Sequence, residues 1–473
     1  MEAVSSPFCF IWILIQGCVF MSTVAAISTA QGQGGIGVIR ISGEKSFEIT
    51  DKIFKSVSGK KIADIKGYTA LFGHIYHNDE RIDEVVALKY ISPKSFTGEN
   101  VVEISCHGGM FITREVLKCV IDAGATLAQP GEFTKRAYLN GKMDLTEAES
   151  VMDIISAQSK DAVRAAMFVK EGVLYKKSIE IKDLLLNKTA HLSAWADYPE
   201  EDIPEVTTES VKDAVEKSIE TLKKLLSTYD AGQVIKEGID TVIAGRPNAG
   251  KSTLMNLLAG REKSIVTSVA GTTRDVVEDT VLVGNVLLKL SDTAGIRETD
   301  NEIEKIGVQK TMEKIHSCGL VIALFDNSEK LTDEDIKLID EIRDMPSIAV
   351  INKTDLDNKI NIEYINNSIK HIVYISAKNE ENIEELKNVI EKVAGTENFD
   401  PSGGVIANER QRNAIKMAIE NLYEAKSALD MGLTLDAVTV SLQETIDCLL
   451  ELTGEKASEE IVDSVFHNFC VGK

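Results

Sequence analysis

The segment that most constrains the fold is Gly245–Ser252, which reads Gly-Arg-Pro-Asn-Ala-Gly-Lys-Ser. It matches the G-x-x-x-x-G-K-S pattern and lies between an apolar run, Thr241–Ala244, and a stretch of helical character, Thr253–Leu258. Strand, glycine-rich loop and helix are the context of a phosphate-binding loop, because backbone amides and the helix N-terminus then face the phosphates. We therefore expect Lys251 to reach the β- and γ-phosphates of a nucleotide and Ser252 to ligate Mg²⁺.

Further motifs follow in the order that a GTPase requires. They are Gly271–Asp275 (Gly-Thr-Thr-Arg-Asp), Asp292–Gly295 (Asp-Thr-Ala-Gly), Asn352–Asp355 (Asn-Lys-Thr-Asp) and Ser376–Lys378 (Ser-Ala-Lys). Thr273 is predicted to complete the Mg²⁺ shell, while Asp292 holds the ion through water. The carboxylate of Asp355 can accept hydrogen bonds from guanine N1 and its amino group, donors that adenine does not offer. GTP is therefore the expected substrate.

The predicted nucleotide site combines the phosphate loop, a switch loop and two base-binding motifs. Its residues are Asn248, Ala249, Gly250, Lys251, Ser252, Thr253, Thr267, Ser268, Val269, Ala270, Gly271, Thr272, Thr273, Asp292, Thr293, Ala294, Gly295, Asn352, Lys353, Asp355, Ser376, Ala377 and Lys378.

Ile296 stands where a Ras-like enzyme has a water-orienting glutamine, directly after Asp292–Gly295. Hydrolysis then needs another route. A cation near Asn248 could supply the positive charge that an arginine finger otherwise brings to the transition state. A carboxylate such as Glu304 could orient the water, although the residues alone favour Glu304 as one of several acids on a solvated surface from Glu298 to Glu304.

The chain of 473 residues is long enough for about three domains. Residues 21–141 alternate β-rich runs with turn signals and two helical stretches, which predicts a compact α+β domain. Residues 142–236 and 396–473 carry amphipathic helical stripes, and 237–395 alternates strands and helices in a doubly wound α/β pattern. The chain is thus predicted to be a multidomain α/β protein whose GTPase domain is inserted into a helical domain.

The strands expected in the α+β domain are Thr23–Ile27, Gly37–Ile41, Tyr68–Tyr76, Val85–Tyr90 and Val101–Cys106, with helices near Phe47–Phe54 and Thr113–Ala123. In the GTPase domain we expect strands at Thr241–Ala244, Val286–Leu290, Leu320–Phe325, Ser347–Ile351 and Ile372–Ile375, with helices at Lys251–Leu258 and Asn382–Val393.

The chain is acidic, with a formal net charge of -22. Such a field repels phosphate backbones and anionic membranes, so nucleic acid would need a local patch or a partner to hold it. The seven cysteines show no C-x-x-C spacing, which favours a reducing cytoplasm and predicts no transition metal. The apolar run Phe8–Phe20 is too short to span a bilayer and has no basic flank, so we interpret residues 1–20 as an extension preceding a true start at Met21.

Both ends of the chain resemble one family, the bacterial tRNA-modification GTPases MnmE (TrmE). The similarity runs from Met21 to Lys473 and rests on motifs outside the GTPase domain. These motifs are Met21–Ser28, Gly34–Gly43, Ser95–Glu99, His107–Gly109, Pro130–Ala137 and the terminal Phe469–Lys473.

The resemblance implies a reaction and a set of partners. Members of this family install an aminomethyl or carboxymethylaminomethyl group on C5 of the wobble uridine of certain tRNAs, together with the flavoprotein MnmG. The resemblance therefore implies a homodimer that joins MnmG in a heterotetramer or larger assembly, with FAD on the partner and tRNA held largely by it. A tetrahydrofolate, as the 5-formyl or methylene derivative, would supply the carbon unit.

The resemblance also implies site residues in this chain. Folate would be held by Arg40, Glu103, Lys142 and Lys473, and Cys470 is either a functional or an inert thiol. K⁺ would bind to Asn248, Thr267, Val269 and Thr272, and Glu304 would orient the attacking water while two GTPase domains approach each other. The predicted catalytic residues are Glu304, Asn248 and Lys251.

A ribosome-assembly or stress-signalling GTPase is the alternative, because GTPase domains with Asn248 and Ile296 also resemble ribosome-associated GTPases. The flanking motifs favour tRNA modification, and no KH-type RNA-binding motif is evident in the sequence.

Overall fold

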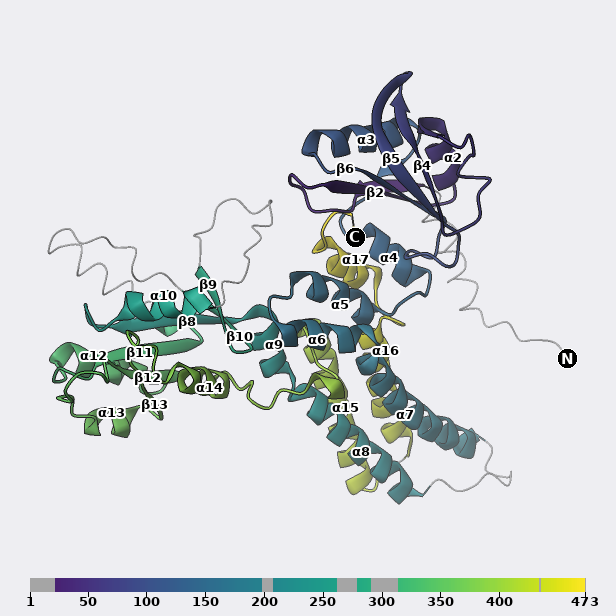
Figure 1. Cartoon of the computed structure of the whole chain (residues 1–473). Helices are drawn as coiled ribbons and strands as arrows, with labels where there is room; N and C mark the ends of the chain where they lie inside the picture. Colours follow the sequence, from purple (N-terminus) through teal and green to yellow (C-terminus); the bar gives the residue numbers. More distant parts are fainter. Residues whose placement is uncertain (1–21, 198–206, 262–278, 291–313, 434, 473) are drawn as a thin grey trace. The chain divides into compact units, whose positions relative to one another are not determined.

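The computed structural model describes residues 22–197, 207–261, 279–290, 314–433 and 435–472 (Figure 1). The chain divides into two compact units, one of Met1–Met152 with Leu450–Lys473 and one of Asp153–Leu449. Across the described ranges, none of the helices combines the length and the apolar character needed to cross a membrane.

The first unit is built on a seven-stranded sheet with the strand order β3-β4-β5-β6-β2-β1-β7. The strands are β1 Val24–Ile27, β2 Ile36–Ser42, β3 Phe54–Ser56, β4 Thr69–His77, β5 Glu80–Tyr90, β6 Val101–His107 and β7 Thr126–Leu127. Neighbouring strands are antiparallel except β1 and β7, which are parallel. Helices α2 Ser46–Ile53 and α3 Met110–Asp122 share an apolar core with this sheet, whose strands alternate buried and more exposed residues.

The C-terminal segment packs within the same unit. Helix α17 Glu459–His467 joins α4 Glu132–Leu139 and α5 Leu145–Ser156 in a second cluster that includes Leu145, Phe466 and Phe469. Gly131, with φ +67°, lies so close to α17 that a Cβ there would be 2.6 Å from the Phe466 carbonyl oxygen. A Cβ at Gly472 would be 2.2 Å from the carbonyl oxygen of Ile27 at the end of β1. Side-chain-free residues are therefore needed at both contacts.

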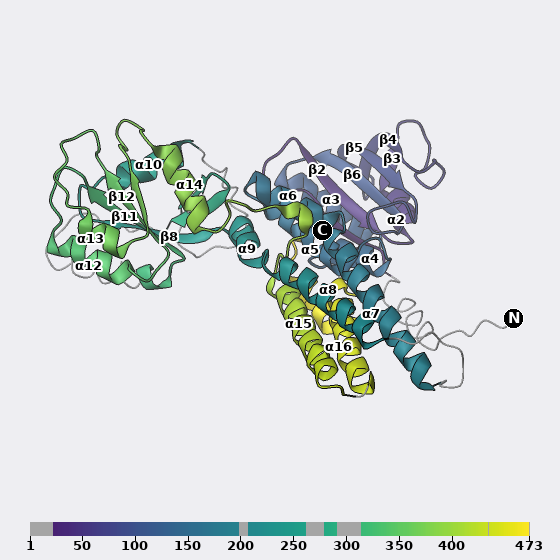
Figure 2. The same cartoon turned by 90° about the horizontal axis from the view of Figure 1, so that it is seen from below.

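Long helices dominate the second unit outside its sheet (Figure 2). They are α6 Lys160–Lys170, α7 Val173–Asp197, α8 Thr208–Leu226, α9 Tyr229–Glu237, α15 Glu409–Asp430 and α16 Leu435–Thr453, with the short 3-10 helix η1 Pro401–Gly403. Helices α8 and α15 lie side by side and bury Val211, Val215, Leu222, Ile415 and Leu422. This burial follows from their amphipathic stripes.

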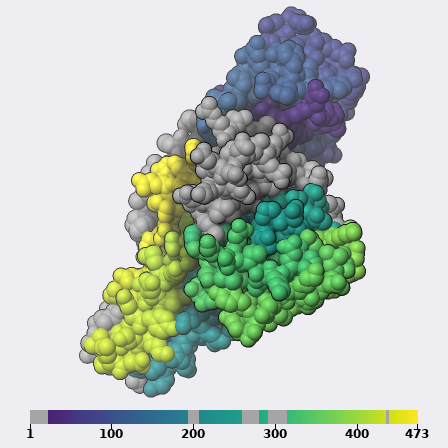
Figure 3. All heavy atoms as spheres, turned by 90° about the vertical axis from the view of Figure 1, so that its left-hand side faces the viewer, coloured from purple at the N-terminus to yellow at the C-terminus, as the bar shows by residue number. Residues whose placement is uncertain are grey.

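A six-stranded sheet forms the rest of the second unit, in the order β13-β12-β11-β8-β10-β9. Its strands are β8 Ile239–Gly245, β9 Asp279–Val283, β10 Val286–Leu290, β11 Leu320–Asp326, β12 Ser347–Asn352 and β13 His371–Tyr374, all parallel to their neighbours except β9. Helices α10 Lys251–Arg261 and α14 Ile383–Val393 cover one face, and α12 Asp333–Ile342 and α13 Glu363–Ser368 cover the other. In the space-filling view the green residues, which include most of this sheet and its helices, form one continuous body (Figure 3).

The predicted fold class is confirmed. The first unit is α+β, the sheet of the second unit is doubly wound, and its strands and helices interrupt the run of long helices. The domain boundaries at residues 141, 236 and 395 stay predictions.

Candidate functional site

The phosphate loop connects β8 to α10 with an unusual backbone. Gly245 and Gly250 have φ of +149° and +102°, and Asn248 has φ +63°. A Cβ on Gly250 would be 2.3 Å from Nδ2 of Asn352. Glycine is required at this position both for its left-handed conformation and for the close approach of another loop.

Lys251 lies at the start of α10 with its ammonium folded over the loop. Its Nζ donates to the carbonyl oxygens of Gly245 at 2.6 Å and Arg246 at 3.1 Å. Burial lowers the pKa of Lys251 from its ordinary value. Ser252 and Thr253 follow it in the first helical turn and are exposed, as is Asn248. The loop thus presents a cation, a hydroxyl and a helix N-terminus together, which suits a phosphate group with a bound Mg²⁺.

Asn352 ties the phosphate loop to the base-binding motifs. The residue is 2% exposed, and its side chain donates to the Ala249 carbonyl oxygen at 2.8 Å and accepts from the Ala377 amide at 2.9 Å. These two hydrogen bonds join three motifs, of which the phosphate loop lies about a hundred residues before the other two in the sequence. The carboxyl ends of β8 and β12 meet at one sheet edge, which is where ligands bind in open α/β sheets.

Asp355 lies at that edge with its carboxylate held in place by Ser376. The Ser376 hydroxyl donates to Asp355 Oδ1 at 2.7 Å, and this hydrogen bond lowers the pKa of Asp355 below its ordinary value. The carboxylate therefore stays an acceptor at neutral pH, as guanine recognition requires. Lys353, with φ +65°, pairs with Asp326 at 2.5 Å, and Lys378 is exposed.

Part of the predicted nucleotide site lies outside the described residues. These positions are Thr267, Ser268, Val269, Ala270, Gly271, Thr272, Thr273, Asp292, Thr293, Ala294, Gly295 and Glu304. The second Mg²⁺ ligand, the carbonyl ligands of K⁺ and the water-orienting carboxylate therefore stay predictions.

The first unit brings together two of the four residues predicted to hold folate, Arg40 and Glu103, which we call the candidate folate pair. They are opposite each other on β2 and β6, and both Nε and Nη2 of Arg40 lie 2.9 Å from Oε1 of Glu103. Both side chains remain partly exposed, at 14% and 23%. Tyr90 donates to Glu103 Oε2 at 3.1 Å, and the Arg40 guanidinium lies 5.2 Å and 5.4 Å from the ring centroids of Phe96 and Phe133.

The other two predicted folate residues, Lys142 and Lys473, are not seen in contact with this pair among the described residues. Lys142 donates to the Pro93 carbonyl oxygen at 3.1 Å, and no described contact joins it to the candidate folate pair. Lys473 lies outside the described residues. The exposed Cys470 precedes it, and its carbonyl oxygen accepts from the Gly131 amide at 3.4 Å, which places the C-terminal segment beside α4.

Sequence reasoning missed Tyr90, Phe96 and Phe133. Phe96 lies within the motif Ser95–Glu99 and Phe133 within Pro130–Ala137, so the motifs contained a signal. Tyr90 gave a weaker one, because its hydroxyl reaches Glu103 diagonally across neighbouring strands.

A second pair of ionisable residues, His107 and Asp83, lies at the end of β6. His107 Nδ1 lies 2.7 Å from Asp83 Oδ1, and the other carboxylate oxygen accepts from the His107 backbone amide at 2.9 Å. Asp83 is buried while the imidazole is 63% exposed. The hydrogen bond to Asp83 raises the pKa of His107 above its ordinary value.

Comparisons with known proteins agree on one family over most of the chain. A family described as "MnmE helical domain" matches residues 145–470, and one described as "GTP-binding protein TrmE N-terminus" matches residues 23–142. The chain is similar to the tRNA modification GTPase MnmE of Clostridioides difficile (strain 630), with 41% identity over 454 residues that cover 95% of this chain and 99% of the relative. The tRNA modification GTPase MnmE of Alkaliphilus oremlandii (strain OhILAs) is 40% identical over 461 residues, at 95% and 99% coverage.

Among solved structures, Era of Aquifex aeolicus bound to GDP·AlF4⁻ matches with 24% identity, over 39% of this chain and 66% of that chain. The TM-score is 0.25, which is too low to add to the assignment. The match of the helical domain alone spans more than half of the chain, and the curated relatives match nearly end to end. The chain therefore belongs to the MnmE family of tRNA modification GTPases.

Proposed function

We propose that this chain hydrolyses GTP to drive the addition of an aminomethyl or carboxymethylaminomethyl group to C5 of the wobble uridine of certain tRNAs. The observation that carries the proposal is the joined nucleotide site, in which Asn352 links the phosphate loop to Ala377 beside the guanine-binding Asp355. Relatives named as tRNA modification GTPases, 40–41% identical over nearly their full length, supply the pathway.

GTP hydrolysis requires charge neutralisation around the phosphates rather than covalent chemistry. Lys251 would contact the β- and γ-phosphates, and the exposed Ser252 hydroxyl would hold Mg²⁺ together with Thr273. The exposed Asn248 offers an amide oxygen at the loop where K⁺ would bind, with Thr267, Val269 and Thr272 completing the site. Glu304 would orient the attacking water.

The K⁺ proposal has a direct assay. GTP hydrolysis should be several-fold faster in KCl than in NaCl at equal ionic strength, and Asn248→Ala should abolish this difference. The exposed Asn398, in the segment that follows α14, gives the control variant Asn398→Ala, which should keep the K⁺ response. Equal rates in the two salts for the wild-type chain would remove K⁺ from the mechanism.

We further propose that the candidate folate pair holds a tetrahydrofolate derivative. A pterin presents a guanidine-like edge that a carboxylate can pair with, and Glu103 supplies one beside the Arg40 cation. Phe96, which is partly exposed beside Arg40, offers apolar surface on which a planar heterocycle can pack. Isothermal titration with 5-formyltetrahydrofolate should show binding by the wild-type chain and a large loss for Glu103→Ala, and unchanged affinity would remove Glu103 from the site.

We propose that the chain forms a homodimer and acts in the cytoplasm together with the flavoprotein MnmG. MnmG would carry the FAD and supply much of the surface that binds tRNA. The deciding experiment is nucleoside mass spectrometry of tRNA from cells that lack the gene, complemented with wild type, Asn248→Ala or Asn398→Ala. A C5-modified wobble uridine that returns with wild type and Asn398→Ala but not with Asn248→Ala would support the proposal. An unchanged tRNA profile in the deletion strain would instead favour a ribosome-assembly or stress-signalling switch.

A further inference from the structure

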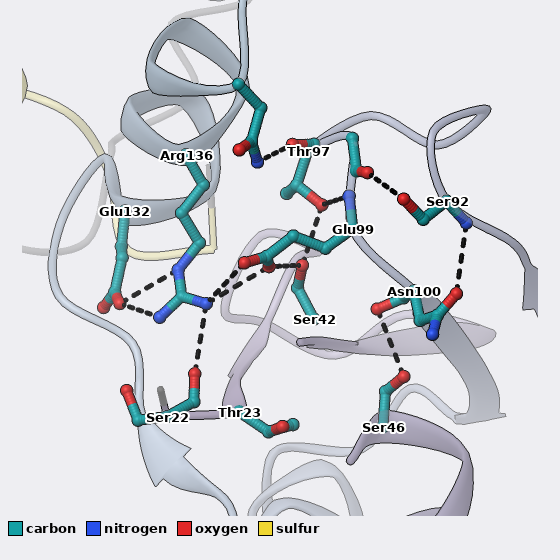
Figure 4. Close-up of polar contacts among 12 residues, drawn as sticks. Ser22, Thr23, Ser42, Ser46, Ser92, Thr97, Glu99, Asn100, Glu132 and Arg136 are labelled. Carbon is teal, nitrogen blue, oxygen red and sulfur yellow. Dashed lines mark hydrogen bonds and ion pairs between the residues drawn. The ribbon is translucent and has the colours of Figure 1, made fainter. Parts of the chain in front are cut away.

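A buried charged cluster lies in the first unit. Arg136 on α4 is 1% exposed, and its Nη1 lies 3.1 Å from both carboxylate oxygens of Glu99 (Figure 4). Its Nη2 lies 2.7 Å from Oε1 of Glu132, and Nη1 also donates to the Ser22 carbonyl oxygen at 3.1 Å. Burying a guanidinium is tolerable only when its donors are satisfied in this way.

The cluster extends by hydrogen bonds into β2 and into the loop before β6. The Ser42 hydroxyl lies 2.6 Å from Glu99 Oε2 and 2.8 Å from the Thr97 hydroxyl, and both hydroxyl residues are fully buried. Asn140, which follows α4, donates to the Thr97 carbonyl oxygen at 2.7 Å. Ser22, the end of β2, the loop before β6 and α4 are therefore held together by one network of polar contacts.

Two members of this network are next in sequence to the rings that flank Arg40. Thr97 follows Phe96, and Glu132 precedes Phe133. Phe133 is itself fully buried against β1. Its position therefore depends on α4 and on β1, next to which Ser22 accepts a hydrogen bond from Arg136. A shift of the loop or of α4 would move a ring that contacts the Arg40 guanidinium.

We infer that Arg136, with Glu99 and Glu132, is a positioning residue for the candidate folate pair. It holds Phe96 and Phe133 at the distance at which they flank Arg40, and so fixes the guanidinium that faces the ligand. Its donors are turned to Glu99, Glu132 and the Ser22 carbonyl, so it acts through these neighbours and not by contact with folate. The inference rests on the proposed folate site.

A purely structural cluster would stabilise the unit without affecting the ligand. The variant Asp51→Ala controls for this effect, because Asp51 on α2 accepts from the amides of Ile62 and Ala63 at 2.7 Å and 3.1 Å and has no described contact with the network. Asp51→Ala is expected to destabilise the same unit by removing contacts of α2 that lie outside the network. Arg40→Met serves as the positive control for lost binding.

The first measurement is the Kd of the full chain for 5-formyltetrahydrofolate, taken at a temperature at which circular dichroism shows every variant folded. We expect Arg136→Lys and Glu99→Gln to weaken folate binding about tenfold or more. Lysine cannot reproduce the forked donors of the guanidinium, and each variant loses charge-assisted hydrogen bonds between residues 136 and 99. Asp51→Ala should bind within about twofold of wild type. Wild-type affinity in Arg136→Lys, with binding lost in Arg40→Met, overturns the inference and leaves the folate site intact.

The second measurement needs no ligand. Urea unfolding of Arg40→Met, Arg136→Lys and the double variant gives the coupling between two residues that are linked through Phe96, Phe133 and strand β2. A coupling of about threefold or more in the unfolding equilibrium constant supports positioning, while additive effects overturn it. If the wild-type chain binds no folate, the proposed folate function fails, and this cycle alone decides whether the cluster positions Arg40.

Discussion

Asp355 is the side chain that we expect to select the nucleotide. Its carboxylate is fixed by the Ser376 hydroxyl and kept ionised, so it offers acceptors alone. Guanine presents two donors on the edge that such a group would face, and adenine does not. We therefore expect nucleotide selectivity at this site to depend on the donor and acceptor pattern of the base rather than on pocket size.

Replacing the Asp355 carboxylate by an amide should change which nucleotide base the site prefers. Asp355→Asn is expected to lower GTP affinity by about 100-fold or more, because its amide N–H would face the donor at guanine C2. Affinity for xanthosine triphosphate should rise, since xanthine carries a carbonyl there. Fluorescent-nucleotide competition measures both, with the exposed Asp357→Asn as control. An Asp355→Asn chain that still prefers GTP would show that guanine is read elsewhere.

His107 should give the first unit a pH-dependent stability. Its pKa is raised in the folded chain by the hydrogen bond to Asp83, so the folded state holds the proton more tightly than the unfolded chain. The stabilisation is present in full below the ordinary histidine pKa of about 6.5 and is lost as the pH rises through the raised value.

Thermal melting between pH 5.5 and about 8.5, compared with His107→Gln, isolates this contribution. The difference in melting temperature between wild type and variant should shrink as the pH rises. A difference that is constant or that grows with pH would contradict a raised pKa for His107.

At the scale of elements, glycines decide where helices can approach other segments. Gly131 and Gly141 share φ +67°, yet a Cβ at Gly131 would meet Phe466 while one at Gly141 would have nothing within 4 Å. The two positions therefore separate the cost of backbone conformation from the cost of overlap with α17.

We expect Gly141→Ala to lower the free energy of unfolding by about 1–2 kcal/mol, the cost of a left-handed alanine. Gly131→Ala should lower it by about 3 kcal/mol or more, because overlap adds to that cost. Urea denaturation followed by circular dichroism measures both, and limited proteolysis should show α17 released first in Gly131→Ala. Equal losses in the two variants would mean that α17 does not press on Gly131.

The elements that sequence predicted best have an unambiguous hydrophobic period. The strand expected at Val286–Leu290 is found with those bounds, and the helix expected near Phe47–Phe54 is found at Ser46–Ile53. The two-residue β7 and three-residue β3 were not predicted, because so few residues show no period. Helix α4 was also missed, since its buried Arg136 is a charge that pattern reasoning places in solvent.

The candidate site was predictable only where residues are close in sequence or belong to a motif. The phosphate loop and the Asp355 motif could be assigned directly, because their spacing alone specifies phosphate and guanine recognition. The ion pair between Arg40 and Glu103 could not, since it depends on which residues of β2 and β6 are opposite each other. The register of two strands depends on the packing of the whole sheet and cannot be deduced from the sequence of either strand alone.

At the scale of the whole molecule, the net charge of -22 bears on how tRNA is held. An acidic chain attracts a phosphate backbone only at local patches, so we expect the isolated chain to bind tRNA weakly. With about three phosphate contacts, affinity should fall roughly 40-fold between 50 and 200 mM salt.

Filter binding across a salt series tests this prediction, with and without the flavoprotein partner. The partner should raise the affinity and steepen the salt dependence, because more cations then face the phosphates. Tight, salt-resistant binding by the chain alone would contradict the proposed division of labour between the two proteins.

The pairing of Met1–Met152 with Leu450–Lys473 in one unit has a consequence for synthesis on the ribosome. The apolar surface around Leu145 and Tyr138 is buried by α17, which emerges roughly 300 residues later, or about 15–60 s at ordinary elongation rates. During that interval the apolar surface of α4 and α5 is exposed, at the place where Gly131 will contact Phe466. Ribosomes that stall within the GTPase domain would leave this surface open, so chaperones should engage those nascent chains more than finished ones.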